Sequence, residues 1–125
     1  MKKQITSPKA PEAIGPYSQA IKINDLVYTS GQIAIVDGKL IEGNAGDQAK
    51  LVMENLKAVL ESAGVNFDNV VKTTIFLTEM TDFAAVNEVY RSFMSQPYPA
   101  RETVSVKQLP LNASVEISMV ACIGK

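Results

Sequence analysis

The sequence predicts an α+β fold in which two helices cover one face of a sheet of five to six mostly antiparallel strands. Two observations indicate this fold. Apolar residues recur with the two-residue period of a strand toward both ends of the chain, and with the helical period in two central segments. The resulting order of strands, helix, strand, helix and strands is that of a two-layer domain. The length of 125 residues is typical of one domain, so we expect a single domain over residues 1–125.

The expected strands are short runs of alternating or β-branched residues bounded by turn residues. In chain order they span Gln19–Ile23, Leu26–Ser30, Gln32–Val36, Val70–Leu77, Thr103–Gln108 and Val115–Ile123, with Leu40-Ile41 as a return strand for the third. Asn24-Asp25 and Asp37-Gly38 stand between neighbouring strands, and these residue types tolerate the positive φ of a hairpin turn. The first sixteen residues contain three prolines, and we expect no regular element there.

Two segments have the helical period. The first runs from Asp47 to Ala63, with its apolar residues on one stripe and with Gly64 placed to cap its end. The preceding residues 43–46 are predicted to form a loop. The second helix begins at Thr81-Asp82 and runs to about Met94, beyond which prolines prevent its continuation.

The strands carry apolar residues on both sides, although two helices can cover only one face of a sheet. On the last expected strand Val115, Ile117 and Met119 point to one face, whereas Val120 and Cys122 point to the other. An apolar sheet face with no covering element in the chain is expected to be buried by another copy of the chain. The sequence therefore predicts an oligomer.

The composition excludes several classes of protein. The chain has no histidine and one cysteine, which excludes Ser-His-Asp and Cys-His nucleophile systems, an intrachain disulfide and paired-cysteine zinc or redox centres. We expect neither a metal nor a cofactor. The net charge of −1 argues against nucleic acid as the main partner. With no apolar stretch of about 18 residues and no signal-peptide pattern, we expect a cytoplasmic protein without a membrane partner.

Arg101 and Glu116 are the main candidate functional residues. Arg101 follows Pro99-Ala100 at a strand start, and its planar guanidinium suits bidentate binding of a carboxylate or phosphate. The alternative for Arg101 is a surface ion pair with its neighbour Glu102. Glu116 lies between apolar residues, where burial would raise its pKa and pairing with Arg101 would lower it. It is either a general acid or base, or an exposed charge on a half-exposed strand.

Five segments make the chain resemble the RidA/YjgF family. In order, they are IGPYSQA (14–20), YTSGQI (28–33), VVKTTIFLTEMTDFAAVNEVY (70–90), PAR (99–101) and LPLNASVEI (109–117). The resemblance extends over nearly the whole chain, and the segments follow one another at the family's spacing. It implies a chorismate-mutase-like α+β fold and a homotrimer with pockets at the subunit interfaces, in agreement with the uncovered sheet face.

The resemblance also implies an activity, which is the hydrolysis of reactive 2-imino or enamine acids to 2-oxo acids and ammonia without a cofactor. Substrates of this class include 2-iminobutanoate and 2-iminopropanoate. Arg101 would bind the substrate carboxylate, and Glu116 would activate the attacking water. The other residues that would bind substrate or shape the pocket are Gly31, Ser30, Tyr17, Asn87 and Thr103.

One departure from the family pattern concerns the two residues after the PAR motif. Many deaminating members have Ser-Cys there, whereas this chain has Glu102-Thr103. Thr103 keeps a small polar side chain, and strand alternation directs Glu102 to the face opposite Arg101. Two other functions stay open: a non-catalytic trimeric protein that binds small ligands and acts in regulation, and a ribonuclease or translation inhibitor. The acidic balance and the lack of a basic or aromatic platform disfavour the last of these.

Overall fold

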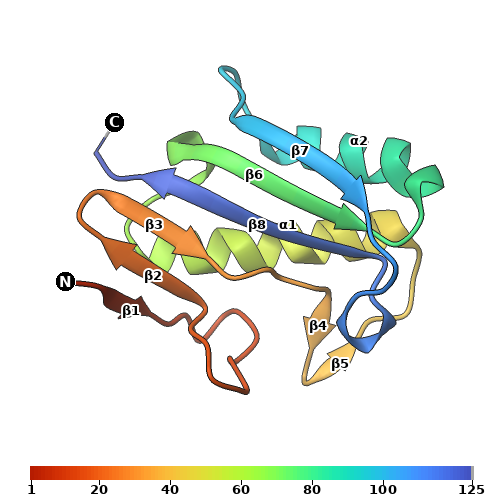
Figure 1. The fold of residues 1–125 in the computed structure, drawn as a ribbon, viewed down its shortest axis with the longest axis horizontal. Coiled ribbons are helices and arrows are strands. Elements are labelled where there is room, and N and C mark those ends of the chain that lie inside the picture. Colours follow the sequence, from red (N-terminus) through yellow and green to blue (C-terminus); the bar gives the residue numbers. More distant parts are fainter. Residues whose placement is uncertain (125) are drawn as a thin grey trace.

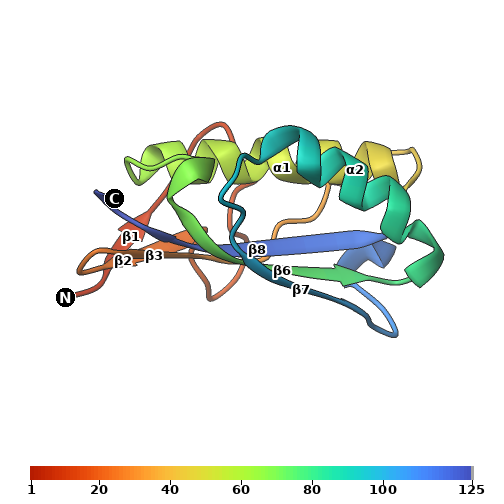
Figure 2. The same cartoon turned by 90° about the horizontal axis from the view of Figure 1, so that it is seen from above.

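The computed structural model describes residues 1–124 and has two layers, a six-stranded sheet and two helices that lie on one side of it (Figure 1, Figure 2). Across the sheet, the strands are β1 (Lys3–Ile5), β2 (Ala20–Ile23), β3 (Leu26–Thr29), β8 (Val115–Cys122), β6 (Val70–Leu77) and β7 (Ala100–Ser105). The helices are α1 (Ala45–Ser62) and α2 (Phe83–Phe93). Only β6 and β7 are parallel neighbours in this sheet of the described chain. The predicted α+β fold is therefore confirmed.

Both predicted hairpin turns are present. Asn24, with a φ of 53°, lies between β2 and β3. Asp37 and Gly38, with φ values of 52° and 78°, join β4 (Ile35–Val36) to β5 (Lys39–Leu40). These two strands form a small separate sheet, so the third predicted strand is shorter than expected. Its first residue, Gln32, instead forms an isolated bridge with Ile117 of β8.

The N-terminal segment contains a strand that the sequence did not predict. The expectation that residues 1–16 lack regular structure is wrong for β1, which pairs antiparallel with β2 and buries Ile5. The partner strand stabilises this short element, so local residue preferences do not reveal it. The buried side chain of Gln19 holds the segment that follows, because it accepts a hydrogen bond from Ser7 N (2.6 Å) and donates one to Pro11 O (2.8 Å).

Helix α1 begins at Ala45, two residues before the predicted start. The expectation of a loop over residues 43–46 is therefore wrong for residues 45 and 46, which belong to the helix. The Asn44 side chain accepts a hydrogen bond from Asp47 N (2.9 Å), and the Asp47 carboxylate accepts one from Asn44 N (3.2 Å). This reciprocal capping box satisfies two N–H groups that have no partner inside a helix. After the helix, Gly64 has a φ of 82°, as predicted for a capping glycine.

Strand β7 begins and ends three residues earlier than the predicted span Thr103–Gln108. Its position follows from parallel pairing with β6, which places Arg101 beside Thr73 and Thr103 beside Ile75. This pairing joins segments far apart in the chain, and a local residue pattern does not specify it. The result is that Arg101 and Thr103 point to the same side of the sheet as the helices.

The other central elements lie close to their predicted spans. Strand β6 has the predicted bounds, and β8 ends one residue early, at Cys122. Helix α2 begins two residues later than predicted because Met80–Asp82 form a 3₁₀ turn before it. No helix among residues 1–124 is long and apolar enough to cross a membrane.

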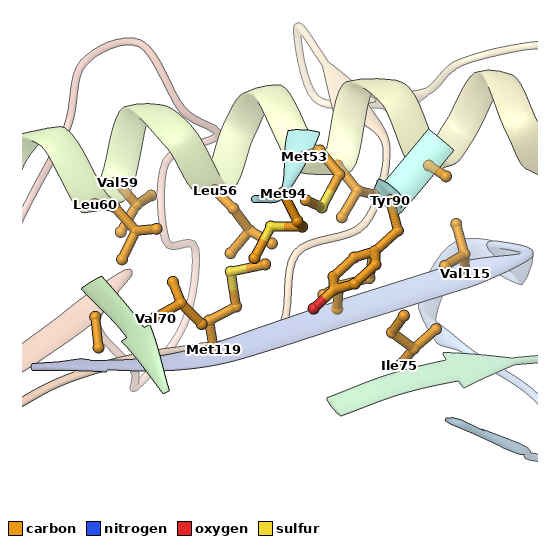
Figure 3. Close-up of a cluster of buried hydrophobic side chains, with 14 of the residues drawn as sticks. Met53, Leu56, Val59, Leu60, Val70, Ile75, Tyr90, Met94, Val115 and Met119 are labelled. Atoms are coloured by element: carbon orange, nitrogen blue, oxygen red, sulfur yellow. The ribbon is translucent and has the colours of Figure 1, made fainter. Parts of the chain in front are cut away.

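The core lies between the helices and the inner face of the sheet. Inward and outward side chains alternate along β8, so that Ile117 and Met119 are buried while Glu116 and Ser118 are not. Figure 3 shows side chains of α1, among them Leu56, directed onto Met119 and its neighbours. Full burial of an aliphatic side chain of this size contributes about 1.5–3 kcal/mol. The core therefore depends on the register that turns these residues inward.

The opposite side of the sheet, which we call the open face, has no covering element among the described residues (Figure 2). By strand register it carries Ile23 and Tyr28 at one end and Val104 at the other. These side chains are 37%, 46% and 42% exposed, respectively. The second apolar face that the sequence predicts is therefore present.

Truncating the α1 core tests this packing. We expect Leu56→Ala to lower the free energy of unfolding by about 2–5 kcal/mol, because Leu56 is fully buried and the surrounding side chains cannot close the cavity. Urea denaturation followed by circular dichroism measures the change. The exposed neighbour Lys57 provides the matched control, since Lys57→Ala should alter the stability by no more than about 0.5 kcal/mol. Equal losses in the two variants would contradict the assigned helix orientation.

Candidate functional site

Arg101 is held against α2 by three side chains. Its Nη1 donates a hydrogen bond to Asn87 Oδ1 (2.7 Å), and its guanidinium carbon lies 5.1 Å from the centre of the Tyr90 ring and 5.7 Å from that of Phe83. A hydrogen bond to a charged group contributes about 1.5–3 kcal/mol. This is comparable to the roughly 2 kcal/mol of rotamer entropy that an arginine side chain carries. Arg101 is therefore positioned before any ligand binds.

Tyr90 is in turn fixed between the helix and the sheet. Its hydroxyl donates a hydrogen bond to Thr73 Oγ1 of β6 (3.0 Å), and Figure 3 shows the ring directed from α2 toward the sheet. Burial raises the pKa of Tyr90, while the hydrogen bond to Thr73 and the charge of Arg101 act in the opposite direction. Tyr90 is not among the site residues that the sequence predicts. Phe83, Asn87 and Tyr90 follow one another at intervals of four and three residues, so all three lie on one side of α2. This spacing is the sequence signal by which Tyr90 could have been identified.

Glu102 points away from Arg101, as strand alternation predicted. Its carboxylate accepts a hydrogen bond from Thr74 Oγ1 (2.7 Å) and pairs with Lys72 Nζ (3.0 Å) on the open face. These hydrogen bonds lower the pKa of Glu102. The alternative in which Arg101 forms a surface ion pair with Glu102 is therefore wrong. The guanidinium of Arg101 keeps its charge free for a ligand.

A pocket of about 400 Å³ opens beside Arg101. It is lined by Asn87, Tyr90, Arg91, Tyr98, Pro99 and Arg101. Thr103 lies on the same side of β7, and its buried Oγ1 has no hydrogen-bond partner among residues 1–124. We call Phe83, Asn87, Tyr90, Arg101 and Thr103 the arginine cluster. The cluster presents a fixed cation to the pocket, which suits a small anion.

Glu116 lies on the open face of β8 and is partly buried, which raises the pKa of its carboxyl group. A methyl group at Gly31 would overlap this carboxylate, since it would lie 2.7 Å from the carboxyl carbon. The close approach is fixed by two backbone hydrogen bonds of the adjacent bridge, Gln32 N to Ile117 O (2.9 Å) and Ile117 N to Gln32 O (3.2 Å). Glycine at position 31 therefore leaves the space that the Glu116 carboxylate occupies, and a larger residue would have to displace that side chain.

Ser30 and Tyr17 lie near Gly31 but differ in their surroundings. The Ser30 hydroxyl donates a hydrogen bond to Ser18 O (2.6 Å), so it holds the neighbouring loop. Tyr17 is 53% exposed and lines a second pocket, of about 430 Å³, together with Gly31. We call Tyr17, Ser30, Gly31 and Glu116 the glutamate cluster.

The two clusters do not meet within one chain. On β6, Thr73 is the register partner of Arg101 and Phe76 is that of Glu116. Arg101 and Glu116 are therefore three residues apart along the strands and two strands apart across the sheet. At ordinary strand spacings their Cα atoms are roughly 14 Å apart. Their side chains also point to opposite faces. Pairing of Glu116 with Arg101, one of the arrangements considered from the sequence, does not occur within the chain.

These features define a class of site: a preordered cation for a small anion, and a separate, partly buried carboxyl group of raised pKa. The model of the family described as Endoribonuclease L-PSP matches residues 7–123. Together with the named relatives, this match shows that the chain belongs to the RidA/YjgF family.

Three similar proteins illustrate the range of the family. The mouse protein named 2-iminobutanoate/2-iminopropanoate deaminase is 42% identical and aligns over 99% of this chain and 93% of its own length. The chloroplastic Reactive Intermediate Deaminase A of Arabidopsis thaliana is 43% identical, and the match covers 96% of this chain but 65% of that protein. The crystal structure of Escherichia coli TdcF with bound serine superposes with a TM-score of 0.91 at 38% identity, covering 98% and 99% of the two chains.

The contact between Gly31 and Glu116 provides a test of the glutamate cluster. We expect Gly31→Ala to displace the Glu116 carboxylate toward solvent, because the added methyl group occupies its position. The pKa of Glu116, followed by carbon NMR during a pH titration, should then fall toward the ordinary value of about 4.3. Gly38→Ala is the control for the general effect of replacing a glycine: it strains the backbone at a φ of 78°, but its Cβ meets no atom within 4 Å, so the pKa of Glu116 should not change. An unchanged Glu116 pKa in Gly31→Ala would contradict the proposed contact.

Proposed function

We propose that this protein hydrolyses 2-imino acids and their enamine tautomers, such as 2-iminobutanoate and 2-iminopropanoate, to 2-oxo acids and ammonia. The observation that carries the proposal is the Arg101 guanidinium, which is fixed by Asn87, Phe83 and Tyr90 and has no carboxylate partner among residues 1–124. The printed names of the mouse and Arabidopsis relatives support the activity. The serine bound to TdcF supports a small ligand with an α-carboxylate.

In this proposal Arg101 binds the substrate carboxylate. A guanidinium forms two parallel hydrogen bonds to a carboxylate and so fixes its orientation as well as its position. The imine carbon is bonded directly to that carboxylate, so its position is then also set. Holding it in one place replaces a bimolecular encounter with attack by a positioned water. Thr103 lies on the same face of β7, and in this proposal its hydroxyl, buried in the single chain, is uncovered to meet the bound substrate.

Glu116 acts as the general base in the proposed reaction. Its raised pKa makes it a stronger base than an exposed glutamate. It takes a proton from water as the water oxygen bonds to the imine carbon, whose C=N electron pair moves to the nitrogen, and the nitrogen takes a proton from solvent. The protonated Glu116 then returns its proton to the amino group of the carbinolamine, the C–N bond breaks to release ammonia, and the hydroxyl group loses its proton to solvent as it becomes the carbonyl. In this proposal the backbone N–H of Gly31, beside the Glu116 carboxylate, donates a hydrogen bond to the substrate.

A complete site requires two copies of the chain, because the arginine and glutamate clusters lie on opposite faces of one sheet. We propose a homotrimer in which the open face of each subunit is covered by its neighbours. Each pocket then combines the arginine cluster of one subunit with the glutamate cluster of the next. Tyr17 and Asn87 would close the pocket from the two sides. A cyclic trimer has three equivalent interfaces of this kind.

Mixing two inactive variants tests the composite site. We expect Arg101→Ala and Glu116→Ala each to abolish the acceleration of 2-iminobutanoate decay, measured by competition with semicarbazide trapping. After refolding of an equimolar mixture, activity should return to about one quarter of the wild-type value, because a random ring restores both residues at one interface in four.

The control for this experiment is each variant refolded alone, which should stay inactive. If both residues acted from the same chain, the mixture would also stay inactive, and the composite site would be wrong. Retention of wild-type rates in either single variant would contradict the roles of the residues. Binding of 2-oxobutanoate without any acceleration of imine loss would favour the regulatory function instead.

The pH dependence tests the role of Glu116. A general base must be ionised, and burial raises the pKa of this carboxyl group, so its inactive protonated form persists to a higher pH. We therefore expect kcat/KM to fall on acidification with a midpoint above about 4.3, the ordinary value for glutamate. Rates are corrected for uncatalysed hydrolysis at each pH. Glu116→Gln should lack this acid limb, and a midpoint at or below the ordinary value would contradict the assignment.

A further inference from the structure

Both arginines of the chain line the same pocket. The sequence contains only Arg91 and Arg101, although it has ten lysines. The two arginines come from different elements, Arg91 from the last turn of α2 and Arg101 from β7, and they meet at the pocket of about 400 Å³. The role proposed for Arg101 uses one cation. The second cation has no role in the proposed reaction.

Arg91 differs from Arg101 in how firmly it is held. It follows Asn87 by four residues and therefore lies on the same side of α2. Its guanidinium pairs only with Glu88, at 3.5 Å, and the two side chains are 64% and 70% exposed. Exposed pairs of this kind contribute little to stability and exchange readily with solvent. Arg91 is thus available to a ligand, whereas Arg101 is fixed.

The charges around the pocket favour a ligand with two negative groups. None of the six lining residues is acidic. Glu102, the nearest carboxylate along β7, lies on the opposite face and is paired with Lys72. The hydroxyl of Tyr98, which is 52% exposed at the rim, adds a hydrogen-bond donor. A pocket with two guanidinium groups and no acidic lining residue suits a dicarboxylate better than a monocarboxylate.

We infer that Arg91 is a specificity-determining residue and that the preferred substrates are 2-imino dicarboxylic acids, whose second carboxylate is in the side chain. This inference rests on the proposed imine hydrolysis. The fixed Arg101 holds the carboxylate next to the reacting carbon. The mobile Arg91 binds the distal carboxylate, and its flexibility accommodates side chains of different length. Monocarboxylic imines are hydrolysed by the same residues without this second contact.

The test compares two imines in the intact protein. 2-Iminosuccinate and 2-iminobutanoate are generated from aspartate and 2-aminobutanoate by amino-acid oxidases, and kcat/KM is measured for each. We expect Arg91→Gln to lower kcat/KM for 2-iminosuccinate about tenfold, mainly through KM, which corresponds to about 1.4 kcal/mol. The fall for 2-iminobutanoate should be clearly smaller, so that the ratio of the two kcat/KM values changes. Arg91→Lys should keep part of the preference because it keeps the charge.

Two control variants separate a local contact from a general charge effect. Lys3→Gln removes one positive charge from β1, the strand at the other edge of the sheet, and should leave both substrates unaffected. Glu88→Gln frees Arg91 from its ion partner and should lower KM for 2-iminosuccinate. If Arg91→Gln changed neither substrate, or reduced both equally, the inference would be overturned.

A binding measurement tests the inference independently of catalytic activity. Calorimetry with the stable compounds 2-oxoglutarate and 2-oxobutanoate should show tighter binding of the dicarboxylate, and Arg91→Gln should remove that preference. If the wild type hydrolysed neither imine, the proposed function would fail and the calorimetry alone would decide the inference. If the wild type hydrolysed 2-iminobutanoate but showed no dicarboxylate preference in either measurement, only the inference would fail.

Discussion

The antiparallel pairing of β6 with β8 determines how the rest of the molecule is arranged. Its register turns Ile75 and Ile117 inward toward the helices and turns Glu116 outward onto the open face. Because β7 pairs in turn with β6, the same register places Arg101 on the helix side. A slip of one residue would exchange the two faces and bring Glu116 into the core, where an unpaired carboxylate is costly. The packing that stabilises the sheet therefore also separates the two functional clusters.

The two clusters differ in the surroundings of their charged group. Arg101 is exposed, but its orientation is fixed by an amide and two aromatic rings, so its charge is available and its position is defined. Glu116 is partly buried without a cation beside it, so its charged form is disfavoured and its basicity rises. An imine is already electrophilic, and its hydrolysis needs orientation, a base and a water. Joining the clusters across a subunit interface would supply the first two without a histidine.

Much of the fold follows from local patterns, whereas the features set by distant pairing do not. Strand β6 has the predicted bounds because seven of its eight residues are β-branched or apolar, the exception being Lys72, and turn residues precede it. Strand β1 and the start of β7 depend on partners elsewhere in the sheet, so local residue patterns predict neither. In the site, residue chemistry and the family resemblance identified Arg101 and Glu116 separately. Their opposite orientation and the aromatic support from Tyr90 became apparent only with the strand register and the helix packing.

The pair formed by Lys72 and Glu102 has a consequence for assembly. It lies on the open face, with Thr74 completing the hydrogen bonds of the carboxylate. Desolvating a charge is costly unless its hydrogen bonds are satisfied, and here one carboxylate is already satisfied by a hydroxyl and an ammonium group of its own chain. In the proposed trimer a neighbouring subunit would cover this pair, and the hydrogen bonds within its own chain would offset part of the desolvation cost. An alignment that broke these bonds would leave a buried charge without a partner, so the pair would disfavour other docking orientations of the open face.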